Sequence, residues 1–337
     1  MTPVFVDVDT GVDDALALLY LLGSPGANLV GIASTGGNVG VEQVCENNLG
    51  LLELCRISGV PVSKGPGDTL TGPLRPPSKV HGPRGLGYAD LPPSSLELTG
   101  HDSATAWVRA ARAFPGELIG VATGPLTNLA LALRAEPALP TLLRRLVIMG
   151  GSYDHRGNVT PVAEWNMSVD PEAAAEVLAA FSAGRAQLPV LCGLDLTRTV
   201  AMTPEHLARL AAAAGSTTAP MSVSDERGTR STASNPLIRV IEDAMRFYLE
   251  AYHDNGHGFE AHLHDPLAAA AALEPGLVTV RPATVDVELT GAHTRGMTVT
   301  DWSGRREPNA LIGVEVDPAA FFDRFIDRVG TFARRLA

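Results

Sequence analysis

The feature that most constrains this chain is a group of four carboxylates placed where a buried strand gives way to a helix. Apolar residues dominate positions 3–8, which predicts a short buried strand, and the Ala- and Leu-rich run from residue 13 predicts a helix. Thr10 and Gly11 lie between the two and predict the turn. The four carboxylates are Asp7, Asp9, Asp13 and Asp14.

Four like charges this close repel one another unless something positive lies among them. Asp7 and Asp9 are two apart on an extended chain and share a face, whereas Asp13 and Asp14 fall in the first helical turn, which favours anions. Hard divalent cations prefer such carboxylate oxygens, and open α/β sheets bind ligands at the carboxyl ends of their strands. Helix capping and solvated loop charges are the alternative. The cluster therefore predicts a metal or catalytic site.

Composition limits the class of protein further. A chain of 337 residues can build a large core, and its net charge of −11 argues against a nucleic-acid partner. The apolar runs are shorter than the roughly 18–20 residues that span a membrane, and the N-terminus lacks a basic signal-peptide region, so we expect a cytoplasmic protein. Three cysteines at positions 45, 55 and 192 fit neither a disulfide framework nor a metal motif and predict buried thiols.

Strand, glycine-containing turn and helix alternate along most of the chain. This pattern predicts a mostly parallel, doubly wound sheet with helices on both faces, in a single domain spanning residues 1–337. A further strand is expected over residues 188–195, and Asp265, which precedes Pro266, is expected to cap an Ala-rich helix. Strands expected at 284–289, 297–300 and 311–316 predict a small antiparallel extension near the C-terminus.

Two regions are predicted to be mobile loops. Residues 64–94 are rich in Gly and Pro without periodicity, and loops of that length are usually functional or mobile. Residues 214–262 begin with a Ser-, Thr- and Gly-rich stretch to 235 and continue through a helix that carries Tyr248 and Tyr252 on one face. Such a Tyr pair is also compatible with plain core packing.

Several polar side chains follow predicted strands. Asn38 comes after a Gly-Gly pair, and His81 lies among glycines in the first long loop. Asn158, Glu164 and Asn166 form a hydrogen-bonding set suited to a polyol, with Trp165 as an apolar wall. Ordinary turns and surface loops are the alternatives in each case.

Other chemistries fit less well. An aspartate-nucleophile phosphatase needs a catalytic Lys before a later acidic pair, which neither Lys64 nor Lys79 supplies, and Gly11 stands at the wrong offset for an EF-hand. Dinucleotide, Walker and Ser-nucleophile motifs are not found. A zinc site remains an alternative for four histidines, although glycines break the helix between the first two. These are His253, His257, His262 and His264.

The N-terminal stretch Asp7-Val-Asp9-Thr-Gly-Val-Asp13-Asp14 resembles the signature of the inosine-uridine nucleoside hydrolase family. Further motifs in the order of that family extend the resemblance over essentially the whole chain. They are Gly37-Asn38, His81-Gly82, Thr123-Gly-Pro-Leu-Thr-Asn128, Met149-Gly-Gly151, Gly157-Asn158, Glu164-Trp-Asn166, Asp170-Pro-Glu-Ala173, Gly193-Leu-Asp195 and His264-Asp-Pro266. Thr10 departs from the family, where many members have Pro, and the 214–235 segment is longer than expected.

The resemblance implies a Ca²⁺-dependent ribonucleoside hydrolase active in nucleoside salvage and catabolism, and a homodimer or homotetramer. The implied Ca²⁺ ligands are Asp9, Asp14, Asp265 and the main-chain carbonyl of Thr123. Asp9 would also be the general base on a Ca²⁺-bound water. The implied ribose-binding residues are Asp13, Asn38, Asn158, Glu164 and Asn166. His81 and His264 would lie beside the base, with Tyr248 and Tyr252 on a mobile helix above it, and Asp7 would order the loop from behind.

The expected reaction takes a ribonucleoside and water to free base and ribose through an oxocarbenium-like transition state. His264 is the candidate acid for the departing base, because an ordinary His titrates near neutral pH. The presence of both His81 and His264 resembles the branch of the family that accepts pyrimidine as well as purine ribosides. A hydrolase of a modified nucleoside and a non-catalytic Ca²⁺-dependent ribose-binding protein are the alternatives.

Overall fold

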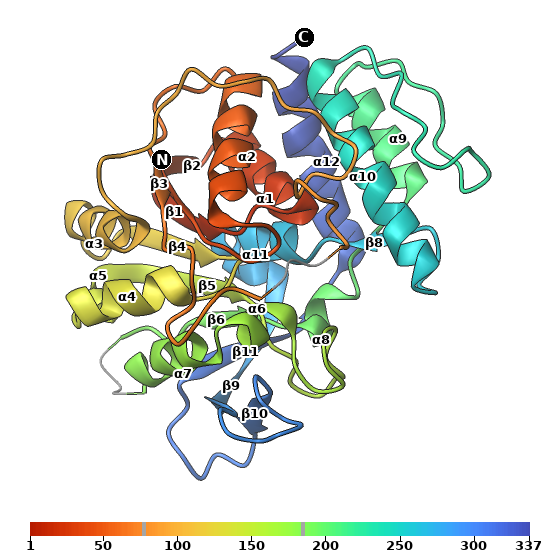
Figure 1. Cartoon of the computed structure of the whole chain (residues 1–337). Helices are drawn as coiled ribbons and strands as arrows, with labels where there is room; N and C mark the ends of the chain where they lie inside the picture. Colours follow the sequence, from red (N-terminus) through yellow and green to blue (C-terminus); the bar gives the residue numbers. More distant parts are fainter. Residues whose placement is uncertain (76–78, 183–185) are drawn as a thin grey trace.

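The computed structural model describes residues 1–75, 79–182 and 186–337. Its main feature is a nine-stranded sheet with the order β10-β9-β11-β6-β5-β4-β1-β2-β3 (Figure 1). The strands are β1 (Thr2–Val8), β2 (Ala27–Ser34), β3 (Val62–Lys64), β4 (Leu118–Ala122), β5 (Leu143–Met149), β6 (Val190–Cys192), β9 (Val278–Val287), β10 (Thr298–Asp301) and β11 (Ala310–Val316). The two remaining strands, β7 (Ala201–Met202) and β8 (Ala261–His262), form a separate antiparallel pair.

The strands from β3 across to β11 are parallel neighbours, which confirms the predicted fold class. In chain order, β2 and β3 are added on one side of β1, and β4 is then added on the other side of β1. The strand order therefore reverses between β1 and β4. In doubly wound sheets such a switch point leaves a crevice beyond the carboxyl ends of the strands, where ligands bind.

Successive side chains of a strand point to opposite faces of the sheet, and the apolar ones on both faces must be buried. Helices therefore cover both faces of the sheet. Val4, Val6 and Val8 of β1 belong to one hydrophobic cluster, while Phe5 belongs to the other and lies 4.6 Å from the Trp107 ring. The first cluster includes side chains of α1 (Val12–Gly23), α2 (Val41–Leu54), α9 (Pro204–Ala213), α10 (Pro236–Asp254), α11 (His264–Leu273) and α12 (Pro318–Arg334). The second includes side chains of α3 (Ser103–Ala113), α4 (Thr127–Ala135), α5 (Leu139–Leu142), α6 (Trp165–Val169) and α7 (Pro171–Ala180).

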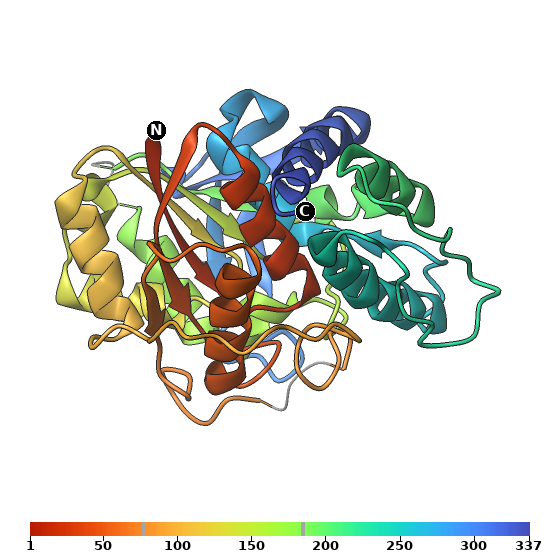
Figure 2. The ribbon, with the colours of Figure 1, turned by 90° about the horizontal axis from the view of Figure 1, so that it is seen from above.

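Figure 2 shows α9 and α10 beside α12, on the side of the molecule away from α3 and α4. The two short elements left are α8 (Leu194–Thr197) and the 3-10 helix η1 (Pro275–Leu277). The antiparallel strands predicted near the C-terminus are confirmed, since β9 pairs with both β10 and β11, but β11 also pairs in parallel with β6. The antiparallel extension is therefore continuous with the parallel sheet.

Two predicted details are wrong. The strand expected over 188–195 ends at Cys192, because Gly193 is the N-cap of α8. Helix α11 begins at His264, so Asp265 lies inside its first turn and Leu263 takes the capping position. The helix predicted to carry Tyr248 and Tyr252, in contrast, is confirmed as α10, which spans Pro236–Asp254.

The three cysteines are buried and free, as expected. Within the described residues, none of the helices has the length and hydrophobicity needed to cross a membrane.

Candidate active site

The polar residues of the site follow the two strands at the switch point or lie at two helix N-termini. Asp9 follows β1, and Thr123 follows β4, its neighbour in the sheet. Asp13 and Asp14 lie in the first turn of α1, and Asp265 lies in the first turn of α11, which packs against α1. The positive ends of the two helix dipoles therefore face the same cluster of anions.

Carboxylate oxygens of Asp13, Asp14 and Asp265 lie within 4.8 Å of one another, and all three residues are buried. This tight group contains Asp13, which the sequence argument assigned to the sugar, and leaves Asp9 outside it. Burial, together with the charge of Asp14, raises the pKa of Asp13 to about 8. Burial is also the main cause that raises the pKa of Asp9, Asp14 and Asp265.

Asp9 is fully buried next to this group. Its Oδ2 accepts the backbone N–H of Asn38 at 2.8 Å, while Oδ1 has no hydrogen-bond partner within the described chain. The backbone around it must come close: a Cβ added to Gly37 would lie 2.1 Å from Oδ2 of Asp9. A buried carboxylate oxygen without a donor is costly unless a cation or a ligand reaches it.

Thr123 links the cluster to the polar wall of the site, which is formed by Asn158, Glu164 and Asn166. Its hydroxyl donates to Oδ1 of Asp14 at 2.6 Å, and its main-chain carbonyl accepts the Asn166 side-chain amide at 2.6 Å. Asn38 adds a side-chain amide at 3.3 Å from Oδ2 of Asp14. Donors therefore surround the cluster without a full positive charge among these contacts.

Asp7 does not belong to this cluster. Its carboxylate accepts from Trp107 Nε1 at 2.7 Å, Asn128 Nδ2 at 2.9 Å and Thr35 Oγ1 at 3.1 Å. Burial raises its pKa to about 6, against the effect of these three donors. The contacts tie the end of β1 to α3 and α4, in keeping with the supporting role expected for Asp7.

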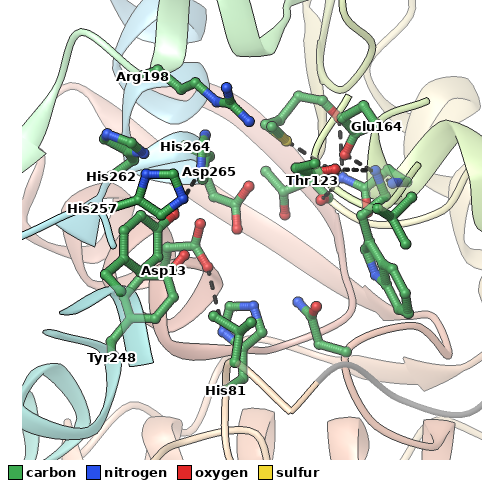
Figure 3. A pocket seen from close by; sticks show the side chains of 18 of the residues that line it. Asp13, His81, Thr123, Glu164, Arg198, Tyr248, His257, His262, His264 and Asp265 are labelled. Carbon is green, nitrogen blue, oxygen red and sulfur yellow. Dashed lines mark hydrogen bonds and ion pairs between the residues drawn. The ribbon is translucent and has the colours of Figure 1, made fainter. Parts of the chain in front are cut away.

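A pocket of about 470 Å³ opens over the cluster (Figure 3). Most residues named from the sequence line it, whereas Asp9 and Asp14 lie buried beneath. The lining residues among them are Asp13, Asn38, His81, Thr123, Asn158, Glu164, Trp165, Asn166, Tyr248, Tyr252, His264 and Asp265.

Glu164 holds the polar wall in shape. It is the N-cap of α6, and its carboxylate accepts the backbone N–H groups of Asn166 at 2.8 Å, Gly151 at 2.9 Å and Met167 at 3.0 Å. Asn158 accepts the backbone N–H of Trp165 at 2.9 Å. The short helix α6, which the sequence argument did not predict, thus orients Trp165 and Asn166 toward the pocket.

The two predicted base-side histidines are both buried. Nδ1 of His81 accepts the backbone N–H of Val12 at 3.1 Å, so the proton of the neutral ring is on Nε2, and burial lowers its pKa to about 4. His264 contacts Thr197 Oγ1 through Nδ1 at 2.7 Å and the Tyr252 hydroxyl through Nε2 at 3.1 Å. Burial holds the pKa of His264 well below its usual range, so it is neutral at pH 7. The sequence argument had assumed an ordinary His.

Helix α10 lies over the pocket and contributes the tyrosine pair. The ring of Tyr248 is 5.1 Å from that of His81 and 4.9 Å from that of Tyr252, measured between centroids. The pair therefore packs on the two histidines of the site as well as on the hydrophobic core.

Among the pocket residues that were not assigned to the site from the sequence, three have basic side chains: Arg198, His257 and His262. The two histidines were noticed as part of a possible zinc cluster. Across the described residues, however, the one group of His, Cys, Asp or Glu close enough to hold a metal ion is the aspartate group. Arg198 directly follows α8 and carries no sequence signal of its own.

Fold and site together define an α/β enzyme whose pocket joins an acidic end to an end lined by aromatic rings and histidines. A family model described as inosine-uridine preferring nucleoside hydrolase matches residues 4–323. The pyrimidine-specific ribonucleoside hydrolase RihA of Salmonella gallinarum is 34% identical over 336 residues, covering 98% of this chain and 99% of RihA. RihA of Shewanella woodyi is 33% identical with the same coverage.

A solved structure agrees with these relatives. The purine-preferring ribonucleoside hydrolase from Gardnerella vaginalis superimposes with a TM-score of 0.87 and 30% identity over 99% of both chains. The chain therefore belongs to the inosine-uridine preferring nucleoside hydrolase family and is an N-glycosyl hydrolase, which confirms the resemblance.

Proposed function

We propose that this enzyme hydrolyses the N-glycosidic bond of purine or pyrimidine ribonucleosides, or both, with Ca²⁺ as its cofactor. The observation that carries the proposal is the buried acidic cluster at the switch point, under a pocket of nucleoside size. Relatives named as pyrimidine-specific and as purine-preferring both match this chain, so the class of base is left open here.

The residues present fit a hard divalent cation. The donors are oxygens only, the carboxylates are buried and close, and Oδ1 of Asp9 lacks a partner in the described chain. Asp9, Asp14, Asp265 and the Thr123 carbonyl would hold the ion, with Asp13 near enough to share it. When bound, the cation would neutralise the cluster and lower the pKa of the attacking water.

The side chains then divide the work. Asp9 takes a proton from the attacking water, a task for which its free oxygen is suited. Asp13, Asn38, Asn158, Glu164 and Asn166 bind the ribose hydroxyls, so 2′-deoxyribosides should react poorly. Tyr248 and Tyr252 cover the base beside His81 and His264 and exclude water from the reacting bond. A homodimer or homotetramer in the cytoplasm stays a prediction, which light scattering on the purified protein checks for its oligomeric part.

The direct test incubates purified enzyme and CaCl₂ with inosine, adenosine, guanosine, uridine and cytidine, and assays reducing sugar and free base. We expect equal amounts of ribose and base from at least one of them. Tight ribose binding without any turnover would instead support the ribose-binding protein. Release of base from a modified nucleoside alone would support the second alternative.

A further inference from the structure

The pocket is divided by charge. Its carboxylates, Asp13, Asp265 and Glu164, lie over the acidic cluster or in the polar wall. At the histidine end stands one full cation, Arg198, with His257 and His262 close by (Figure 3). Since the acidic end suits ribose hydroxyls, the Arg198 end is where the base would lie.

The guanidinium of Arg198 has few polar partners within the described residues. It is the C-cap of α8, and its side chain meets His155, with Nη1 at 3.1 Å from Nδ1 and 3.4 Å from Nε2. Within the described residues, its guanidinium has no carboxylate in salt-bridge range. Arg246, by comparison, is paired with both Asp225 and Glu250. A half-buried cation that faces a pocket without a counter-charge is available for a ligand.

The neighbours of Arg198 place it against the wall that would cover the base. The charge of Arg198 is, after burial, the next cause that lowers the pKa of His262. The ring of His262 lies 5.1 Å from Tyr252 and 5.6 Å from His264. Arg198 is thus near His262 and His264, whose pKa values its charge lowers.

We propose that Arg198 binds the departing base and stabilises it as an anion, and so selects nucleosides whose base carries an oxygen at C4 of a pyrimidine or at C6 of a purine. Uridine and inosine belong to this class, whereas cytidine and adenosine carry an amino group at that position. The inference rests on the proposed function and adds a specificity-determining residue to it.

The chemistry balances without a protein acid. Water adds its oxygen to C1′ and gives one proton to Asp9, while the C1′–N bond breaks and its electron pair goes to the base nitrogen. The negative charge then spreads onto the ring and its exocyclic oxygen, to which the guanidinium can donate charge-assisted hydrogen bonds. The base takes up a proton from solvent after release, and Asp9 returns its proton to solvent. Arginine has donors only, so an amino group at the same position would face donors without an acceptor.

The test compares wild type with Arg198→Gln and Arg198→Lys on uridine, cytidine, inosine, adenosine and p-nitrophenyl β-ribofuranoside. The nitrophenyl riboside carries a leaving group that departs as a stable anion with little help. Arg198→Gln should lower kcat/KM for the better oxo-base substrate by about 100-fold or more, the usual loss for a preorganised charge-stabilising donor. It should change kcat/KM for the nitrophenyl riboside far less, and Arg198→Lys should retain part of the activity.

Arg209→Gln is the matched control, because Arg209 is an exposed arginine on α9 whose partner is Asp323 on α12. Its kinetics should equal wild type, and melting curves of all variants should overlay. An equal fall for every substrate, or no fall, would overturn the role of Arg198 while ribose release by wild type upholds the proposed function. If wild type releases ribose from none of the five, the proposed function itself fails.

Discussion

The backbone N–H of Asn38 donates to Oδ2 of Asp9 across 2.8 Å and leaves Oδ1 of the same carboxylate without a hydrogen-bond partner in the described chain. One oxygen of Asp9 is therefore fixed by the fold, and the other is free for chemistry. This pairing motivates the first prediction.

Asp9→Ala should lower turnover by about 10²–10⁴-fold, the range expected when a general base is lost. The protein should remain folded, because the change removes a buried charge and its repulsion with Asp14. Steady-state rates and circular dichroism on the same sample check both parts. Activity equal to wild type would rule out Asp9 as the base.

Gly37→Ala should inactivate the enzyme by moving Asp9, because a Cβ there would lie 2.1 Å from Oδ2 of Asp9. Gly59→Ala is the matched control, since a Cβ at Gly59 meets nothing within 4 Å. We expect rates to fall at least tenfold for the first variant and to stay unchanged for the second. The steric argument would be wrong if the two variants had the same kcat/KM.

Removal of the cation should make stability depend strongly on pH. The folded-state pKa values of Asp9, Asp13, Asp14 and Asp265 are raised, that of Asp13 to about 8. A group with a raised folded pKa adds stability below its unfolded pKa of about 4, and this is lost as pH rises through the folded pKa.

The chelated protein should therefore melt at progressively lower temperature between about pH 4 and pH 8. Saturating Ca²⁺ should remove most of this decline and restore activity, because the ion replaces protons as the counter-charge. Differential scanning calorimetry with EDTA and with CaCl₂ measures the effect. Parallel pH profiles in the two buffers would contradict a cation at this cluster.

Arg246→Met should destabilise the protein by about 3–5 kcal/mol, the usual result of removing one member of a buried ion pair. Arg246 is buried and donates to Asp225 at 3.0 Å and to the carbonyls of Ser222 and Glu226 at 3.0 and 3.2 Å. These contacts fasten residues 222–226 to α10, which also carries the tyrosine pair. The segment 214–235, irregular in sequence, is thus anchored at its centre.

Arg209→Met serves as the comparison for Arg246→Met, since exposed ion pairs contribute at most about 1 kcal/mol. Urea unfolding measures both variants. A similar loss for the two would show that the network around Arg246 contributes little. Faster proteolysis within residues 214–235 of the Arg246 variant is a second readout.

Local patterns in the sequence were enough to predict the alternation of strands and helices and the acidic end of the site. Asp9 follows β1, and Asp13 and Asp14 begin α1. These residues are close in space because they are close in the sequence. The pairing of β11 with β6 could not be predicted in this way, because periodicity does not say which strand lies alongside. The end of β6 was placed too late because the apolar run continues past Gly193.

The histidine end of the site was less predictable, for a different physical reason. The low pKa of His264 follows from burial under α10, and the availability of Arg198 follows from the absence of a nearby carboxylate among the described residues. Both are properties of the assembled surroundings. A residue type and its spacing carry no information about how much water reaches it.

The contact between α1 and α11 has a consequence for synthesis of the chain. It joins Asp14 to Asp265, more than 200 residues apart, so the acidic cluster closes only after the ribosome has released α11. Contacts of such long sequence separation form slowly. Cation uptake should therefore come late and report that the chain has finished folding.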